Sequence, residues 1–146
     1  MPSEPLGLGI DLGSSGLRLA LIDPAGEVLA EEAAPYPGPF ADPASWRDGL
    51  MSLCARLAPD LRRRVAAMAV DGTSGTLLLC SPDGQPAPGA LGMALPYHRA
   101  CPEQAADAAA LVGPDGAGSP AATASGSLAR ALADRKSTRL NSSHRT

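Results

Sequence analysis

Two short apolar runs and a third, more acidic segment are separated by two turns within the first 34 residues, and no other feature of the chain restricts the fold as strongly. Residues 6–11 and 17–23 flank the small-residue turn 13–16, and residues 27–34 follow the turn 24–26. Short apolar runs joined by turns rich in Gly, Pro and Ser are typical of antiparallel strands. The sequence therefore predicts a three-stranded antiparallel meander at the start of the domain.

The segment after this meander is predicted to be a helix that covers the sheet. Asp42 is a suitable N-cap, and Pro43 stands at the first helical position, where its missing N–H costs nothing. The apolar residues that follow share one helical face, and they are Trp46, Leu50, Leu53, Cys54 and Leu57. We expect this face, including Trp46, to pack on the strands.

Further strands and helices alternate along the rest of the chain. The expected strands are residues 65–70 and 76–80, the expected helices are residues 102–112 and a segment from residue 128, and the expected loops are residues 87–97 and 113–126. Strands interleaved with helices indicate an α/β domain. We expect one domain over residues 6–134, because a chain of this length holds one domain of ordinary size.

The final segment, residues 135–146, differs in composition from everything before it. It contains four Lys or Arg residues, no acidic residue and no apolar periodicity. Its run KSTRLNSSH resembles translated sequencing-adapter read-through. We therefore expect it to lie outside the native domain, and the parent chain to continue differently.

Composition and charge exclude several classes of partner. The net charge of −3 gives no basic surface for nucleic acid or anionic lipid. No apolar run approaches the roughly 20 residues that cross a bilayer, and the start of the chain lacks a signal-peptide pattern, so we expect a cytoplasmic protein. The three cysteines have no C-x-x-C spacing, and we expect reduced, buried thiols rather than a zinc or disulfide framework.

Residues 11–18 (DLGSSGLR) contain the parts of a phosphate site at the end of a strand. Gly13, Ser14 and Ser15 can direct backbone N–H groups and hydroxyls toward phosphate oxygens. Asp11 can hold a hydrated Mg²⁺ ion, and Arg18 can offset phosphate charge. The alternative is a plain hairpin turn in which Asp11 accepts turn N–H bonds. P-loop and dinucleotide-binding motifs are excluded, because the required glycine spacing is missing.

Residues 70–76 (VDGTSGT) repeat this order of strand, acid and small hydroxyl-bearing turn. Asp71, Thr73 and Ser74 offer donors and acceptors at the short reach that a polyol requires. Two such turns at strand ends can face one cleft. A simple turn is again the alternative.

Together these segments resemble the FGGY carbohydrate kinase family, whose domains have the ribonuclease H-like, actin-like ATPase fold. GIDLGSSGLRLALID is similar to the family's first phosphate motif, and VDGTSGTLLLCSPDGQP to the sugar-contacting stretch of its D-ribulose kinase branch. YHRACPEQA resembles that branch's Tyr-Asn-Gln-Ala/Ser-Cys-Pro run, although His98 and Arg99 replace Asn and Gln. The resemblance covers residues from about 6 to about 133.

The resemblance implies ATP-dependent, Mg²⁺-assisted phosphorylation of a ketopentose, with D-ribulose favoured. It implies that Asp11 serves the metal and the sugar, that residues 13–15 bind phosphate, and that Ser74 contacts a sugar hydroxyl. In the family the catalytic aspartate and the adenosine site lie in later sequence, so we expect this chain to be inactive alone. The alternatives are a xylulose or other polyol kinase of the same family, another actin-like kinase of the glucokinase or acetate kinase type, and a non-catalytic sugar-binding module.

Overall fold

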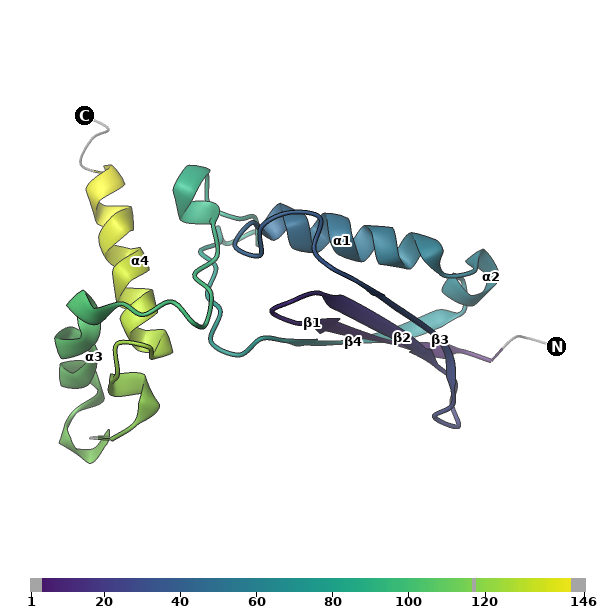
Figure 1. Cartoon of the computed structure of the whole chain (residues 1–146), viewed down its shortest axis with the longest axis horizontal. Helices are drawn as coiled ribbons and strands as arrows, with labels where there is room; N and C mark the ends of the chain where they lie inside the picture. Colours follow the sequence, from purple (N-terminus) through teal and green to yellow (C-terminus); the bar gives the residue numbers. More distant parts are fainter. Residues whose placement is uncertain (1–3, 117, 143–146) are drawn as a thin grey trace. The chain divides into compact units, whose positions relative to one another are not determined.

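The computed structural model describes residues 4–116 and 118–142 of the chain, with side chains as far as Asp134. The chain forms two compact units, one that ends at Thr73 and one that begins at Ser74 (Figure 1). We describe each unit separately.

The first unit is built on a four-stranded mixed sheet. Its strands are β1 (Leu6–Leu12), β2 (Leu17–Ile22), β3 (Val28–Ala34) and β4 (Val65–Gly72). The strand order is β3-β2-β1-β4, in which β1, β2 and β3 pair antiparallel and β4 pairs parallel to β1. The predicted meander and the predicted strand at residues 65–70 are therefore confirmed.

The core of this unit lies on one face of the sheet. Alternate residues of β1 and β2 point to this face, as expected for the two-residue period of a strand. They are Leu6, Leu8, Ile10, Leu17, Leu19 and Leu21, and they pack with Leu53 and Leu57. Figure 1 shows α1 (Pro43–Arg56) along one side of the sheet, followed by the short α2 (Pro59–Arg62).

Helix α1 begins as the sequence predicts but packs through a slightly different face. The carboxylate of Asp42 accepts a hydrogen bond from the N–H of Ala44 at 2.9 Å, and Pro43 opens the helix. The buried residues of α1 are Ser45, Gly49 and Leu53. Glycine suits position 49 because a Cβ there would collide with Cδ1 of Leu17, whose side chain is itself buried. Larger side chains in this part of the helix therefore lie beside the row of buried residues rather than within it.

Trp46 does not pack on the sheet as expected. Its ring lies against that of Phe40, with centroids 5.7 Å apart, and its indole N–H donates to the Phe40 carbonyl at 2.6 Å. Tyr36 contacts the other side of the Phe40 ring in an edge arrangement. The Phe40 carbonyl thus supplies the acceptor that an indole N–H needs when it leaves water.

The second unit is largely irregular and helical. Its helices are α3 (Ala105–Val112) and α4 (Ser127–Ser142), with 3₁₀ turns at Gly89–Gly92, Pro102–Gln104, Pro114–Gly116 and Pro120–Ala122. Cys101, Ala108 and Ala129 form its small core. Residues 135–142, expected outside the fold, continue α4, and residues 143–146 of that segment lie outside the described residues.

The predicted strand at residues 76–80 is wrong. The segment makes only isolated bridges, from Leu77 to Leu95 and from Cys80 to Pro86. Pro86 has no N–H to donate, so a regular ladder cannot continue through it. Cys80 is consequently exposed, contrary to the expectation of a buried thiol, whereas Cys101 is buried and Cys54 is partly buried.

Candidate functional site

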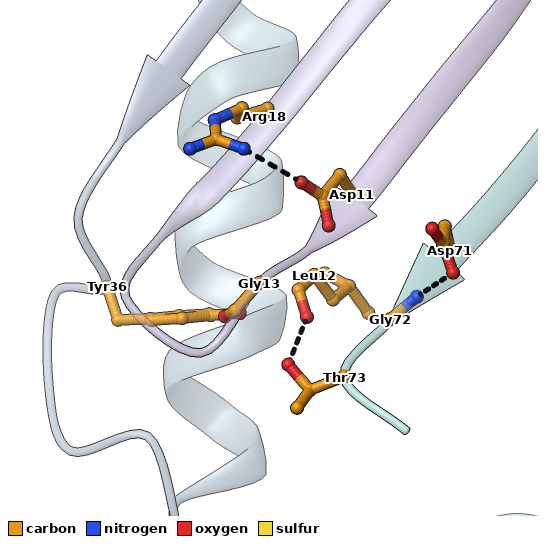
Figure 2. Close-up of polar contacts among 8 residues, drawn as sticks. All are labelled: Asp11, Leu12, Gly13, Arg18, Tyr36, Asp71, Gly72 and Thr73. Carbon is orange, nitrogen blue, oxygen red and sulfur yellow. Dashed lines mark hydrogen bonds and ion pairs between the residues drawn. The ribbon is translucent and has the colours of Figure 1, made fainter.

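Two aspartates end adjacent strands of the first unit. Asp11 in β1 and Asp71 in β4 are direct Cα partners, and the two strands run parallel. Side chains of paired residues point to the same face of a sheet. Because Ile10 faces α1, both carboxylates belong to the opposite face, at the carboxyl ends of their strands (Figure 2).

The turn after β1 is fixed by hydrogen bonds from two other segments. The carbonyl of Leu12 accepts bonds from the N–H of Thr73 at 3.2 Å and from its hydroxyl at 3.3 Å. The Tyr36 hydroxyl donates to the carbonyl of Gly13 at 2.7 Å. At the far end of the turn, a Cβ on Gly16 would lie 2.8 Å from the Ala34 carbonyl oxygen. The turn is therefore held in one shape from both sides (Figure 2).

Ser14 and Ser15 form the tip of this fixed turn. Both are exposed. No hydrogen bond joins either serine to another residue within the described part of the chain. Their N–H and hydroxyl groups therefore remain available to an anion, as a phosphate cradle requires.

Arg18 and Asp11 form an ion pair instead of acting separately. Nη1 of Arg18 lies 3.3 Å from Oδ2 of Asp11, and the two side chains are 71% and 41% exposed. Such an open pair adds little to stability. It can exchange for a ligand, leaving Asp11 for a cation and Arg18 for a phosphate.

The alternative of simple turns applies differently to the two aspartates. The carboxylate of Asp71 accepts a hydrogen bond from the N–H of Gly72 at 2.8 Å, as a turn-stabilising residue does. The hydrogen bond that Asp11 accepts comes from Arg18. Asp11 is thus the better candidate for a ligand-binding carboxylate.

A hollow of about 460 Å³ lies beside Asp11 on the open face of the sheet. Its lining includes Gly9, Arg18, Ala20 and Glu31, which the pairing of β1, β2 and β3 brings together. Glu31 was not predicted as a site residue. The alternation of β3 could have identified it, because Glu31 pairs with Ala20, and Ala20 pairs with Gly9.

The donor set suits a hydrated divalent cation. Mg²⁺ commonly keeps several waters and binds through one or two carboxylates. Asp11 and Asp71 provide this number of carboxylates, and within the described residues no group of three or more His, Cys, Asp or Glu side chains could hold a metal. The site therefore fits a cation shared with a phosphate ligand better than a closed protein cage.

The remaining predicted site residue is Ser74. It is the first residue of the second unit and is exposed. The structure thus brings Asp11, Gly13, Asp71 and Thr73 together within the first unit.

The titration of Tyr36 makes the stability of the first unit depend on pH. Burial raises the pKa of its hydroxyl above 10.0, and the charge of Asp11 raises that pKa further. The neutral phenol is therefore favoured in the folded state. The stability that results is fully present below pH 10 and is lost as the pH rises through the folded-state pKa.

Replacing Tyr36 by phenylalanine should expose both effects. Tyr36→Phe removes the donor to Gly13, and we expect a loss of about 1 kcal/mol in the free energy of unfolding at pH 7. We also expect a shallower decline in stability above pH 10. Urea unfolding at several pH values would measure both. Tyr97→Phe, at an exposed position of the second unit, is the control. If stability declined equally steeply above pH 10 in the unsubstituted chain and in Tyr36→Phe, the raised pKa of Tyr36 would be contradicted.

None of the helices in the described part of the chain has the length and apolar character needed to span a bilayer.

Comparison with known proteins identifies the fold. No family model matches the sequence. The structure is similar to a xylulose kinase from Brucella ovis, with a TM-score of 0.65 and 20% identity over 83% of this chain and 27% of that chain. A xylulose kinase from Bifidobacterium adolescentis gives 0.57 and 20%, over 75% and 21% of the two chains.

A gluconate kinase from Lactobacillus acidophilus gives a TM-score of 0.52 at 17% identity, over 73% of this chain and 23% of that chain. The chain thus spans about a quarter of the length of the sugar kinases it matches. The predicted α/β fold of the actin-like ATPase type is confirmed, over part of those structures.

Proposed function

We propose that the chain is part of an ATP-dependent carbohydrate kinase of the FGGY family that phosphorylates a ketopentose, with D-ribulose favoured over D-xylulose. The observation that carries this proposal is the pairing of Asp11 with Asp71 beside the fixed turn of residues 13–16. The likeness of the fold to that of a xylulose kinase supports the proposal. The sequence likeness of residues 70–86 and 97–105 to the D-ribulose kinase branch supports the choice of sugar.

The phosphate side of the proposed site lies at the β1–β2 turn. Ser14 and Ser15 donate to phosphate oxygens through their N–H and hydroxyl groups, and Arg18 offsets phosphate charge once it leaves Asp11. Asp11 would hold a hydrated Mg²⁺ ion, which would supply positive charge to the phosphoryl group. Holding these groups in place before the ligand binds lowers the entropic cost of transfer.

The sugar side of the proposed site begins at the end of β4. Asp71, Thr73 and Ser74 offer carboxylate and hydroxyl groups to the hydroxyls of a polyol. Thr73 is already anchored to Leu12, so its backbone cannot drift away from the phosphate turn. We propose that the base that deprotonates the sugar hydroxyl is supplied by a longer, cytoplasmic parent chain. This chain alone then binds ligands without turnover.

Two measurements test the proposal. Phosphorylation by the parent chain is assayed with D-ribulose, D-xylulose, L-ribulose and glycerol, and we expect ATP-dependent product with the highest kcat/KM for D-ribulose. For the present chain, nuclear magnetic resonance titration with Mg²⁺ and ATP should shift the amides of Ser14 and Ser15. ATP-dependent product from none of the four substrates would refute the kinase.

A further inference from the structure

A buried arginine organises the second unit. Arg130 of α4 is 3% exposed. Its Nε donates to the carbonyl of Gly75 at 3.0 Å, and its Nη1 donates to the carbonyls of Tyr97 and Ser125, both at 2.7 Å. Two longer bonds reach the Arg99 carbonyl at 3.3 Å and the Ser127 hydroxyl at 3.4 Å.

All five of these acceptors are neutral. A guanidinium stays charged in proteins, and burying a charge is costly unless its donors are fully satisfied. The carbonyls of Gly75, Tyr97 and Ser125 belong to segments far apart in the sequence, and all three converge on the Arg130 guanidinium. An apolar side chain in its place would have no donors for these three carbonyls.

The chain backbone is adapted to the guanidinium at Gly75. Gly75 has a φ of +75°, which L side chains rarely adopt. A Cβ at this position would also lie 2.8 Å from Nη2 of Arg130 and 3.8 Å from the Cβ of Tyr97. The absence of a side chain lets the turn after Ser74 approach both Arg130 and the segment around Tyr97.

Residues at or next to the carbonyls that Arg130 binds carry exposed polar and aromatic side chains. Ser74 and His98 are exposed, and Tyr97 is 43% exposed. The rings of Tyr97 and His98 meet edge to face, with centroids 5.3 Å apart. A hydroxyl, an imidazole and an aromatic face suit a neutral polyhydroxylated ligand, because sugars combine hydroxyl groups with an apolar C–H face.

We propose that Arg130 is a positioning residue that assembles a sugar-binding surface from Ser74 and residues 97–99. The proposal rests on the proposed function for the identity of the ligand. Arg130 itself does not touch the sugar. It sets the distance between the Ser74 turn and the Tyr97 segment, and thereby the affinity for the sugar.

The test compares the variants Arg130→Met and Arg130→Lys with the unsubstituted chain by amide hydrogen exchange. The informative amides are those of Leu77 and Cys101, which bond to Leu95 and Ala124 next to the segments that Arg130 holds. In Arg130→Met we expect both to exchange at least about tenfold faster, because opening becomes easier in this region. Arg130→Lys should recover part of the protection, since an ammonium keeps the charge but lacks the planar fork.

The second readout is sugar affinity, measured from the shifts of the Ser74 and His98 amides during titration with D-ribulose. We expect Kd to rise at least about tenfold in Arg130→Met and by less in Arg130→Lys, the order that the geometry of the donors predicts. Arg47→Met is the control, because Arg47 is an exposed arginine of the first unit that pairs with Asp48. It should change neither exchange at Leu77 nor sugar affinity.

The possible failures can be told apart. Unchanged exchange and unchanged Kd in Arg130→Met would overturn the positioning role. If the amides of Ser74 and His98 in the unsubstituted chain do not shift with D-ribulose, D-xylulose or glycerol, the sugar-binding surface is overturned. This holds even if Arg130→Met changes the hydrogen exchange. If Arg130→Met loses the amide protection of α3, Arg130→Lys decides: a raised Kd with α3 protected supports the proposal, and an unchanged Kd overturns it.

Discussion

Shortening Leu53 to alanine is expected to lower the free energy of unfolding of the first unit by about 2–5 kcal/mol. Leu53 is fully buried at 0% exposure, in the cluster that joins α1 to β1 and β2. The substitution removes its apolar contacts and leaves a cavity that the rigid sheet cannot fill. For a unit of this size the loss is a large share of a total that rarely exceeds about 15 kcal/mol.

Trp46 makes this effect measurable. It is the only tryptophan in the chain and lies in α1, so its fluorescence during urea unfolding follows the first unit. The control is Met51→Ala, on the same helix but 64% exposed, for which we expect a change within about 0.5 kcal/mol. Equal losses for the two variants would show that α1 does not pack through Leu53.

The sheet could be predicted because its signal is local. Alternation of apolar residues in residues 6–11 and 17–23, with turns between them, is enough to pair β1 with β2 and to place Asp11 at a strand end. The apolar run of residues 65–70 likewise places Asp71 at a strand end. The two carboxylates come together, however, only because β4 pairs with β1, and this contact between distant segments is not visible in either strand's own sequence.

Other features depend on contacts that the sequence does not display. Gly49 lies on the buried line of α1 because Leu17 fills the space above it, and hydrophobic periodicity ignores glycine. Residues 76–80 have the composition of a strand, but their partner segment contains Pro86. Nothing in the sequence marks Arg130, because its bonds reach carbonyls up to 55 positions away, such as that of Gly75.

The candidate site, too, could be predicted from the sequence only in part. The turn of residues 13–16 and its two serines follow from composition alone. The anchors that hold the turn do not, because Tyr36 reaches Gly13 from 23 positions away and Thr73 reaches Leu12 from 61 positions away. The bonds from Thr73 connect the start of this turn to the end of β4.

Replacing Asp11 by asparagine in the parent chain is expected to lower kcat/KM for phosphorylation at least about 100-fold, equivalent to about 2.7 kcal/mol of transition-state stabilisation. The amide has nearly the shape of the carboxylate but no charge to hold Mg²⁺. It also releases Arg18 from its ion pair. The open pair contributes little to folding, so we expect less than about 1 kcal/mol of change in stability.

The Mg²⁺ dependence separates a cation role from a general loss of charge. In Asp11→Asn the half-saturating Mg²⁺ concentration should rise, whereas Asp71→Asn should mainly raise KM for the sugar, because Asp71 is proposed to contact the sugar hydroxyls. Asp48→Asn is the matched control, since Asp48 is an exposed carboxylate that pairs with the adjacent Arg47. If Asp11→Asn kept the Mg²⁺ dependence and kcat/KM of the parent chain, Asp11 would be a turn residue and the cation site would lie elsewhere.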